Sequence, residues 1–303
     1  MADGMVRCGE DALKAMVVKR LREVGMPEDQ AVVVADVLVF ADLRGVYSHG
    51  VMRVEHYAAR IRAGGMNLRP VFRFERLKPS IGLVDAQGAS GHVMSAFATD
   101  QALQMAAEQG LAMVGIKNGS HCGALAYYVQ RALDRKMAAM VCVHTDKIVV
   151  PFGGREAYFG TNPFAFGFPG TRESILLDMA TSEVAWGKIL HAREKGQPIP
   201  ATWAVDADGK PCTDPHQAKG LFPFGGPKGY GISVMVEALT GLMIGGVFGP
   251  HLKPMYGELS SYRDLSSFIL IIDPAVFGSA DGYLQRTQQM IDELHSCPPA
   301  AGV

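Results

Sequence analysis

The chain has 303 residues, of which 48% are hydrophobic. This is enough for a sizeable core and excludes a wholly disordered chain. The 29 Lys and Arg residues nearly balance the 30 Asp and Glu residues, so the charge does not favour binding to nucleic acid. Only 19% of the residues are charged, which fits a chain that buries part of its surface in a homo-oligomer.

The cysteines and the apolar runs indicate a cytoplasmic protein. The five cysteines are widely spaced and form no CxxC pair, so the sequence predicts neither a disulfide framework nor a zinc ribbon. The charged N-terminus does not resemble a secretory signal. A membrane helix needs about 20 apolar residues, and the runs here are shorter, so we expect no membrane partner.

The first 65 residues are predicted to be helical. Apolar residues recur at helical spacing over residues 13–24, 31–43 and 51–62. Glycines follow each stretch, and the segment 47–50, with the sequence YSHG, lies between the second and third helices.

From residue 71 the pattern changes to alternating strands and helices, which predicts an α/β architecture. The expected strands are 71–77, 81–85, 112–116, 138–143, 164–168, 175–178 and 267–273, with a surface hairpin at 203–209. The expected helices are 93–109, one ending near 134, one from 225 to 243, and 280–295. The apolar stretch 232–248 is interpreted as a buried helix followed by a loop.

Several common motifs are absent. The sequence has no GxGxxG, no GxxxxGK[ST] and no HExxH, so it lacks the fingerprints of the Rossmann fold, the P-loop and the zinc peptidases. The nine histidines show no metal-ligand spacing, and we expect no catalytic metal.

His121 is a candidate catalytic base. It lies in the segment GSHCG, between an expected strand and helix, and such junctions often form ligand sites in α/β proteins. The positive end of a helix disfavours imidazolium, so a neutral His121 could accept a proton near pH 7. A capping or packing role for this histidine is the alternative.

A second candidate cluster follows Ser48-His49-Gly50. Arg53 and Tyr57 lie on one face of the next helix, and an arginine fork matches a substrate carboxylate. In the alternative interpretation, Ser48 caps the helix and Arg53 forms a surface ion pair.

Two segments could contact a dinucleotide. In GGPKGYG, Lys228 and the backbone N–H groups of Gly229 and its neighbours could hold a pyrophosphate, although the segment could also be a simple turn. Asp178 ends an expected strand, where it could hold a ribose hydroxyl or cap the next segment of the chain.

Seven segments of this chain occur in one order: ADLRGVYSHG, NGSHCGALAYYVQRA, VVPFGG, FGTNPFAF, LDMATSEVAWGKI, WAVDADGKPCTDP and GGPKGYGISVMVEALTGLM. Together they resemble the malate/L-lactate dehydrogenase superfamily that lacks the Rossmann fold. The resemblance extends over residues 10–300.

The resemblance implies an α/β fold with a non-Rossmann dinucleotide-binding mixed sheet flanked by helices and an N-terminal helical region. The implied regions are a helical region (1–70), a connecting α/β region that completes the substrate cleft (71–120), a dinucleotide-binding domain (121–250), and a C-terminal strand and helix that pack back on the substrate region (251–303). Members of the family form homodimers or larger homo-oligomers, and we expect the same here.

The implied reaction is hydride transfer between a nicotinamide cofactor, NAD or alternatively NADP, and a 2-hydroxy acid. RVEHYAARI, HCGALAYYVQ, the proline of GPKGYG and FGPHLKPMYGEL are similar to members that oxidise (S)-ureidoglycolate to oxalurate in allantoin and purine breakdown. Malate, L-lactate or sulfolactate oxidation and cyclic-imine-acid reduction are alternatives within the superfamily, and a non-catalytic relative is an alternative outside the enzymes.

By the same resemblance, His121 is the proton acceptor and His49 a substrate-binding residue or alternative acid. Ser48, Arg53 and Tyr57 are expected to bind the substrate. The expected dinucleotide contacts are Thr145, Asp178, Met179, Ala180, Lys228 and Gly229.

Two features depart from the family pattern. Family members commonly have Ser at the position of Thr145, a change that keeps a hydroxyl. They also continue past this C-terminus with a Tyr-Pro-Gly-like segment that helps to close the nucleotide site. Either this chain is a truncated form, or the cofactor is bound more weakly or in a differently completed site.

Overall fold

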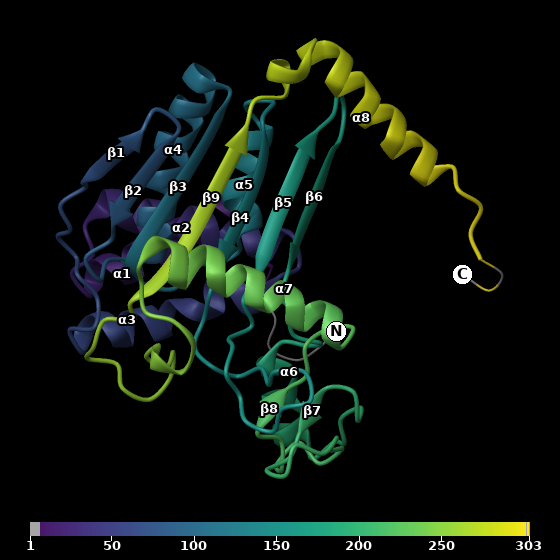
Figure 1. Ribbon diagram of the computed structural model, residues 1–303. Helices are drawn as coiled ribbons and strands as arrows, with labels where there is room; N and C mark the ends of the chain where they lie inside the picture. The colour runs from purple at the N-terminus through teal and green to yellow at the C-terminus, as the bar shows by residue number, and fades with distance from the viewer. Residues whose placement is uncertain (1–6, 301, 303) are drawn as a thin grey trace.

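The computed structural model describes residues 7–300 and 302 (Figure 1). Residues 1–6, 301 and 303, which belong to the first and last predicted regions, lie outside the described part. A seven-stranded sheet forms the centre, in the order β1-β2-β3-β9-β4-β5-β6. The strands are β1 Phe74–Lys78, β2 Ile81–Asp85, β3 Leu111–Gly119, β4 Ala138–Val143, β5 Phe164–Pro169, β6 Ser174–Met179 and β9 Leu265–Ile272.

The sheet is mixed, as predicted. β2 and β3 are parallel, and every other neighbouring pair is antiparallel. β9, from the C-terminal part of the chain, pairs with both β3 and β4 and lies in the middle of the sheet. Its residues Leu265–Ile269 are all buried, as expected for a strand covered on both faces. The sheet therefore takes strands from three of the four predicted regions, and the division into those regions stays a prediction.

Helices cover both faces of the sheet (Figure 1). On one face lie α1 Glu10–Glu23, α2 Glu28–Leu43, α4 Gly91–Gln109 and α5 Ala126–Leu133. On the other lies α7 Pro227–Glu237, which continues into a π-helical turn at Ala238–Leu242. α3 Val54–Arg62 lies at one end of the sheet, and α8 Ala280–His295 extends away from the other end.

The close approach of α4 to the loop after β3 depends on Gly91. A Cβ at this first residue of α4 would lie 2.1 Å from the Ser120 carbonyl oxygen, so no other residue fits without moving the backbone. The N-terminus of α4 is thereby brought against the GSHCG segment.

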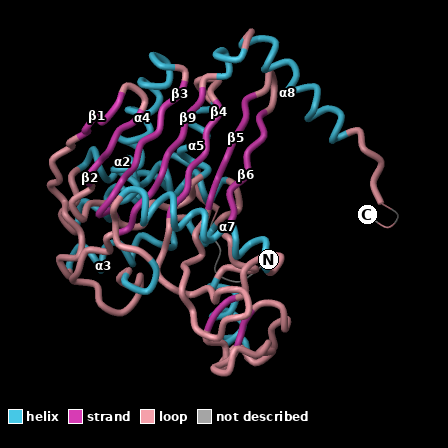
Figure 2. The backbone as a smooth tube through the Cα atoms, viewed as in Figure 1, coloured by secondary structure: helices cyan, strands magenta, loops and turns pink. Residues whose placement is uncertain are grey.

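Most elements expected from the sequence are present within a few residues, but one helix was missed and two interpretations need correction. α6 Trp186–Lys195 was not predicted. β7 Ala204–Val205 pairs with β8 Gly220–Leu221 rather than within residues 203–209, although Asp206 and Lys210 do close the expected turn. Figure 2 shows that this small lobe is largely loop.

The helix at 232–248 is not buried all round. Val234, Met235, Leu242 and Met243 are exposed, while Ser233, Val236 and Glu237 face inward. The apolar stretch was misinterpreted because apolar residues occupy both faces of the helix. None of the helices in the described part of the chain has the length and apolar character to cross a membrane.

Candidate active site

The turn before α3 is held by Asp42 of α2. The Val51 backbone N–H donates to Asp42 Oδ2 over 2.9 Å. A Cβ at Gly50 would lie 1.8 Å from Asp42 Oδ1, so glycine is required at this close approach. This contact fixes the short 3₁₀ turn Tyr47–His49 and with it the position of His49.

Ser48 does not cap α3, which has no side-chain cap. Its Oγ lies 3.0 Å from His49 Nδ1, so Ser48 orients the imidazole.

His121 follows the end of β3, at the junction that the sequence predicted. Its Nδ1 lies 2.8 Å from the Tyr57 hydroxyl and 3.3 Å from the Gly123 backbone nitrogen. Tyr57 is 3% exposed, and burial raises its pKa well above the usual value. The phenol therefore stays protonated and orients the His121 ring.

The two predicted catalytic histidines lie together. The rings of His49 and His121 are nearly parallel, with centroids 5.6 Å apart. Burial, helped by the positive charge of Arg53, lowers the pKa of His49 to about 4. Burial also places the pKa of His121 well below its usual value. Both imidazoles are therefore neutral at pH 7 and can accept a proton.

A third histidine at this site was not predicted. His92 lies in the first turn of α4 and is 1% exposed, and burial lowers its pKa to about 3. Its ring packs edge-on against Tyr57, with a centroid distance of 5.0 Å, and lies 6.1 Å from the His121 ring. No local pattern in the sequence separates this histidine from an ordinary helical residue, because its role comes from the packing of α4 against the GSHCG loop.

Arg53 is not part of a surface ion pair. Its Nε donates to the Ser48 carbonyl over 2.6 Å, and its Nη1 donates to the Tyr256 hydroxyl. Within residues 7–300, no carboxylate lies within ion-pair distance of Arg53. An uncompensated cation beside two neutral imidazoles is the arrangement needed to bind a carboxylate next to a proton acceptor.

The predicted cofactor residues form a second cluster around the ends of β4, β5 and β6. Thr145 Oγ1 accepts the Thr161 N–H over 2.9 Å, and the Thr145 N–H donates to Asn162 Oδ1 over 3.1 Å. Met179 pairs with Phe164 at the end of β6, and Ala180 follows it. Asn162, which lies in the FGTNPFAF segment, is thus a structural support for Thr145.

Asp178 caps α5. Its Oδ2 accepts the N–H of Ala126, the first residue of α5, over 2.8 Å. The capping alternative is therefore observed, although on α5 rather than on the segment after Asp178. A role at a ribose hydroxyl stays a prediction.

Lys228 and Gly229 lie in the first turn of α7, as the GGPKGYG pattern predicted. A Cβ at Gly229 would lie 2.1 Å from the Phe224 carbonyl oxygen, so the loop folds closely over the helix N-terminus. Lys228 is exposed. Ser233 Oγ donates to Thr181 Oγ1 over 2.8 Å, and the Thr181 N–H donates to the Thr161 carbonyl over 2.8 Å. These bonds join α7 to the Thr145 cluster.

These residues fit a dinucleotide. A helix N-terminus with the Lys228 ammonium group beside it matches a pyrophosphate. The Gly229 N–H, however, donates to the Phe224 carbonyl over 3.0 Å, so this glycine shapes the loop and its N–H is not available to a phosphate.

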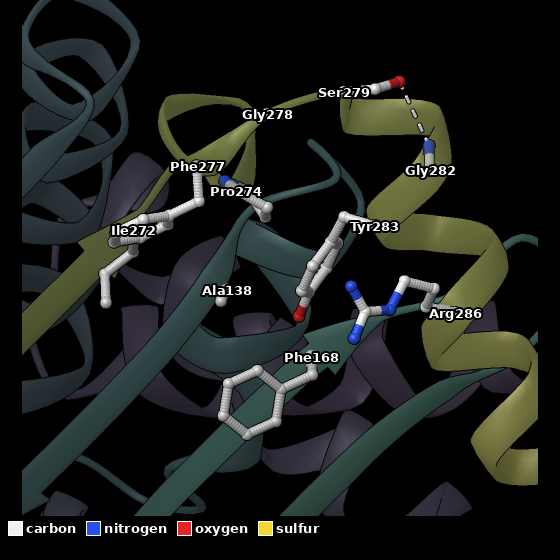
Figure 3. A pocket seen from close by; sticks show the side chains of 10 residues that line it. All are labelled: Ala138, Phe168, Ile272, Pro274, Phe277, Gly278, Ser279, Gly282, Tyr283 and Arg286. Atoms are coloured by element: carbon white, nitrogen blue, oxygen red, sulfur yellow. Dashed lines mark hydrogen bonds between the residues drawn. The ribbon is translucent and has the colours of Figure 1, made fainter.

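The cavity shown in Figure 3 is a different place in the fold. It has a volume of about 390 Å³ and lies between α8 and the sheet, at the start of β4 and the end of β9. The Tyr283 hydroxyl and the Arg286 guanidinium point into it. It is lined by neither a histidine nor a carboxylate, and His121 lies beyond the opposite end of β3, so the cavity is not the candidate active site.

The structure defines an α/β protein with a mixed sheet, in which a histidine–arginine cluster lies at the ends of β3 and α2. The sequence profile of the malate/L-lactate dehydrogenase family matches residues 9–303, and the chain belongs to this family.

Named relatives agree with this assignment. The chain is 41% identical over 298 residues to the ureidoglycolate dehydrogenase (NAD(+)) of Escherichia coli K12, covering 98% of this chain and 85% of that protein. The solved structure of sulfolactate dehydrogenase from Methanocaldococcus jannaschii superimposes with a TM-score of 0.91 at 33% identity, over 97% of this chain and 86% of that one. The malate dehydrogenase structure from Pyrococcus horikoshii OT3 gives a TM-score of 0.88 at 32% identity, over 98% and 84% of the two chains.

Proposed function

We propose that the protein is an NAD-dependent dehydrogenase that oxidises (S)-ureidoglycolate to oxalurate. The observation that carries the proposal is the uncompensated Arg53 guanidinium beside the neutral imidazoles of His49 and His121. The choice of ureidoglycolate is supported by the 41% identity to the Escherichia coli enzyme of that name.

In the proposed mechanism, Arg53 binds the substrate carboxylate and fixes C2 beside the histidines, which is catalysis by positioning. In the tautomer whose Nδ1–H donates to the Tyr57 hydroxyl, Nε2 of the neutral His121 carries the lone pair. Nε2 accepts the proton of the C2 hydroxyl as the hydride leaves C2, so a C–H and an O–H bond break and a carbonyl forms. A nicotinamide dinucleotide, when bound, supplies the hydride acceptor. Tyr57 orients the His121 ring, and His49 contributes a second hydrogen bond to the substrate oxygen.

The residues that would hold the dinucleotide are the cluster joined by the Thr161 and Thr181 bonds. Thr145, Met179 and Ala180 lie at the strand ends, and Lys228 and Gly229 at the N-terminus of α7. Asp178, whose Oδ2 is engaged by α5, would use its other oxygen for a ribose hydroxyl.

Turnover by the purified protein tests this proposal. We would follow reduced nicotinamide by absorbance with NAD or NADP and a panel of ureidoglycolate, malate, L-lactate and sulfolactate, with cyclic imine acids in the reverse direction. Fastest turnover of ureidoglycolate with NAD is the expected result. Preference for another acid would reject the specific substrate, and absence of turnover with every acid and both cofactors would reject the dehydrogenase.

The proposal also covers the metabolic role, the cellular location and the oligomeric state of the enzyme. Breakdown of purines through allantoin yields ureidoglycolate, so we place the enzyme in the cytoplasm, in purine breakdown. We propose a homodimer or larger homo-oligomer, because apolar side chains such as Met16, Met52 and Phe277 are exposed, and measurement of the mass in solution would test this assignment.

A further inference from the structure

Residues 252–263 form a loop that joins the two clusters of the candidate site; we call them the closing segment. The segment lacks helix and strand and runs beside α3 (Figure 1). On the cofactor side, the Met255 N–H donates to Asp146 Oδ2 over 3.1 Å, and Asp146 directly follows Thr145. The segment is therefore anchored next to Thr145 of the dinucleotide cluster.

Two buried arginines hold the closing segment in place. Arg263 pairs with Asp146, and Arg60 of α3 donates to the carbonyls of Ser261 and Met255, each over 2.9 Å. Both arginines are 1% exposed. Breaking the buried ion pair of Arg263 or the carbonyl bonds of Arg60 would leave a buried cation with still fewer partners, so the base of the segment is fixed.

Tyr256, in contrast, is 52% exposed and reaches from the closing segment to Arg53. Its hydroxyl accepts from Arg53 Nη1, and its ring packs edge-on against His56 with centroids 5.1 Å apart. The Arg53 guanidinium is thereby held from two sides, by the Ser48 carbonyl at Nε and by the phenol at Nη1. Within the described residues, Nη2 has no hydrogen-bond partner.

We propose that Tyr256 is a positioning residue for the substrate carboxylate: its hydroxyl fixes the Arg53 guanidinium so that the free Nη2 can take the carboxylate beside the two imidazoles. The inference deepens the proposed function and depends on it, because it names the group that orients the carboxylate clamp. It also connects a loop anchored next to Asp146 to the guanidinium of Arg53.

The direct test is Tyr256→Phe, which removes the hydroxyl and keeps the ring over His56. Hydrogen bonds to charged groups contribute enough that we expect about a tenfold rise in the KM of the 2-hydroxy acid. The kcat and the KM for NAD should change less than about twofold, since the chemical step and the dinucleotide cluster are untouched. The matched control is Tyr262→Phe in the same segment, where the ring lies over Gly88 and the KM should not change.

A double-mutant cycle separates positioning of Arg53 from a direct or structural effect. If Tyr256 acts through Arg53, then Tyr256→Phe has no further effect on KM in an Arg53→Ala background. Equal effects in both backgrounds would overturn the inference, as would an unchanged KM in the single variant.

Calorimetric titration with oxamate, an unreactive 2-oxo-acid probe, separates this inference from the proposed function. Weaker oxamate binding by Tyr256→Phe in a protein that oxidises no 2-hydroxy acid would support the clamp and reject the dehydrogenase. Turnover by the wild type with unchanged oxamate binding in the variant would support the dehydrogenase and overturn the clamp. A wild type that neither binds oxamate nor turns over would overturn both.

Discussion

Removal of the Tyr57 hydroxyl tests how much the orientation of the His121 ring contributes to catalysis. In Tyr57→Phe, His121 Nδ1 loses its 2.8 Å partner and keeps the Gly123 backbone nitrogen at 3.3 Å. A hydrogen bond between neutral groups contributes about 0.5–1.5 kcal/mol, and about 1.4 kcal/mol corresponds to a factor of ten. We therefore expect kcat to fall by up to about tenfold, with a smaller change in the KM of the acid.

The matched control is Tyr128→Phe. Tyr128 is also fully buried, and its hydroxyl donates to the Cys122 carbonyl over 2.6 Å. Each variant keeps its ring and loses one buried hydrogen bond, so urea titration should show similar losses of unfolding free energy, about 1–3 kcal/mol. Steady-state kinetics should show reduced kcat in Tyr57→Phe alone. Equal kcat losses in both variants would mean that general support of the loop matters, and would refute the specific pairing of Tyr57 with His121.

Two further predictions concern the cofactor and pH. Lys228→Met should raise the KM for NAD about tenfold and leave kcat nearly unchanged, because an ammonium group at the α7 N-terminus is lost. The control is Lys195→Met, at an exposed position of α6. An unchanged KM in Lys228→Met would remove Lys228 from the cofactor site. Unfolding free energy should fall as pH drops below about 6.5, because the pKa of His92 is about 3 when folded and the unfolded chain then binds the extra proton. His92 contributes a fall of about 1.4 kcal/mol per pH unit. Urea titrations at several pH values should show that the unfolding free energy depends less on pH in His92→Gln than in the wild type. The control is His216→Gln, at an exposed position, which should behave like the wild type.

Most strands of the sheet were predictable because their patterns are local, whereas its mixed character was expected only from the family resemblance. Residues 138–143 form β4, and residues 280–295 form α8, as their periodicity indicated. The place of β9 between β3 and β4 was not predictable, because the sequence of a strand does not specify its neighbours. α6 was missed because it buries only Ile189 and Ala192, which leaves too weak an apolar stripe to detect.

The candidate site likewise contains residues that local motifs predicted and a contact that they did not. His49, Arg53, Tyr57 and His121 were singled out from motifs, and the structure brings these four residues together. Tyr256 lies 203 residues from Arg53 in the sequence, and this contact depends on the whole path of the chain from α3 to the closing segment. Local patterns do not carry such long-range contacts.

The most direct test of the central claim is the rate of NADH formation from ureidoglycolate and NAD by wild type and His121→Ala, measured side by side. We predict turnover by the wild type and a loss of about 10²-fold or more in kcat for the variant, the effect of removing a general base. Circular dichroism and the urea midpoint would establish that the variant is folded. Comparable kcat values in the two proteins would contradict the account.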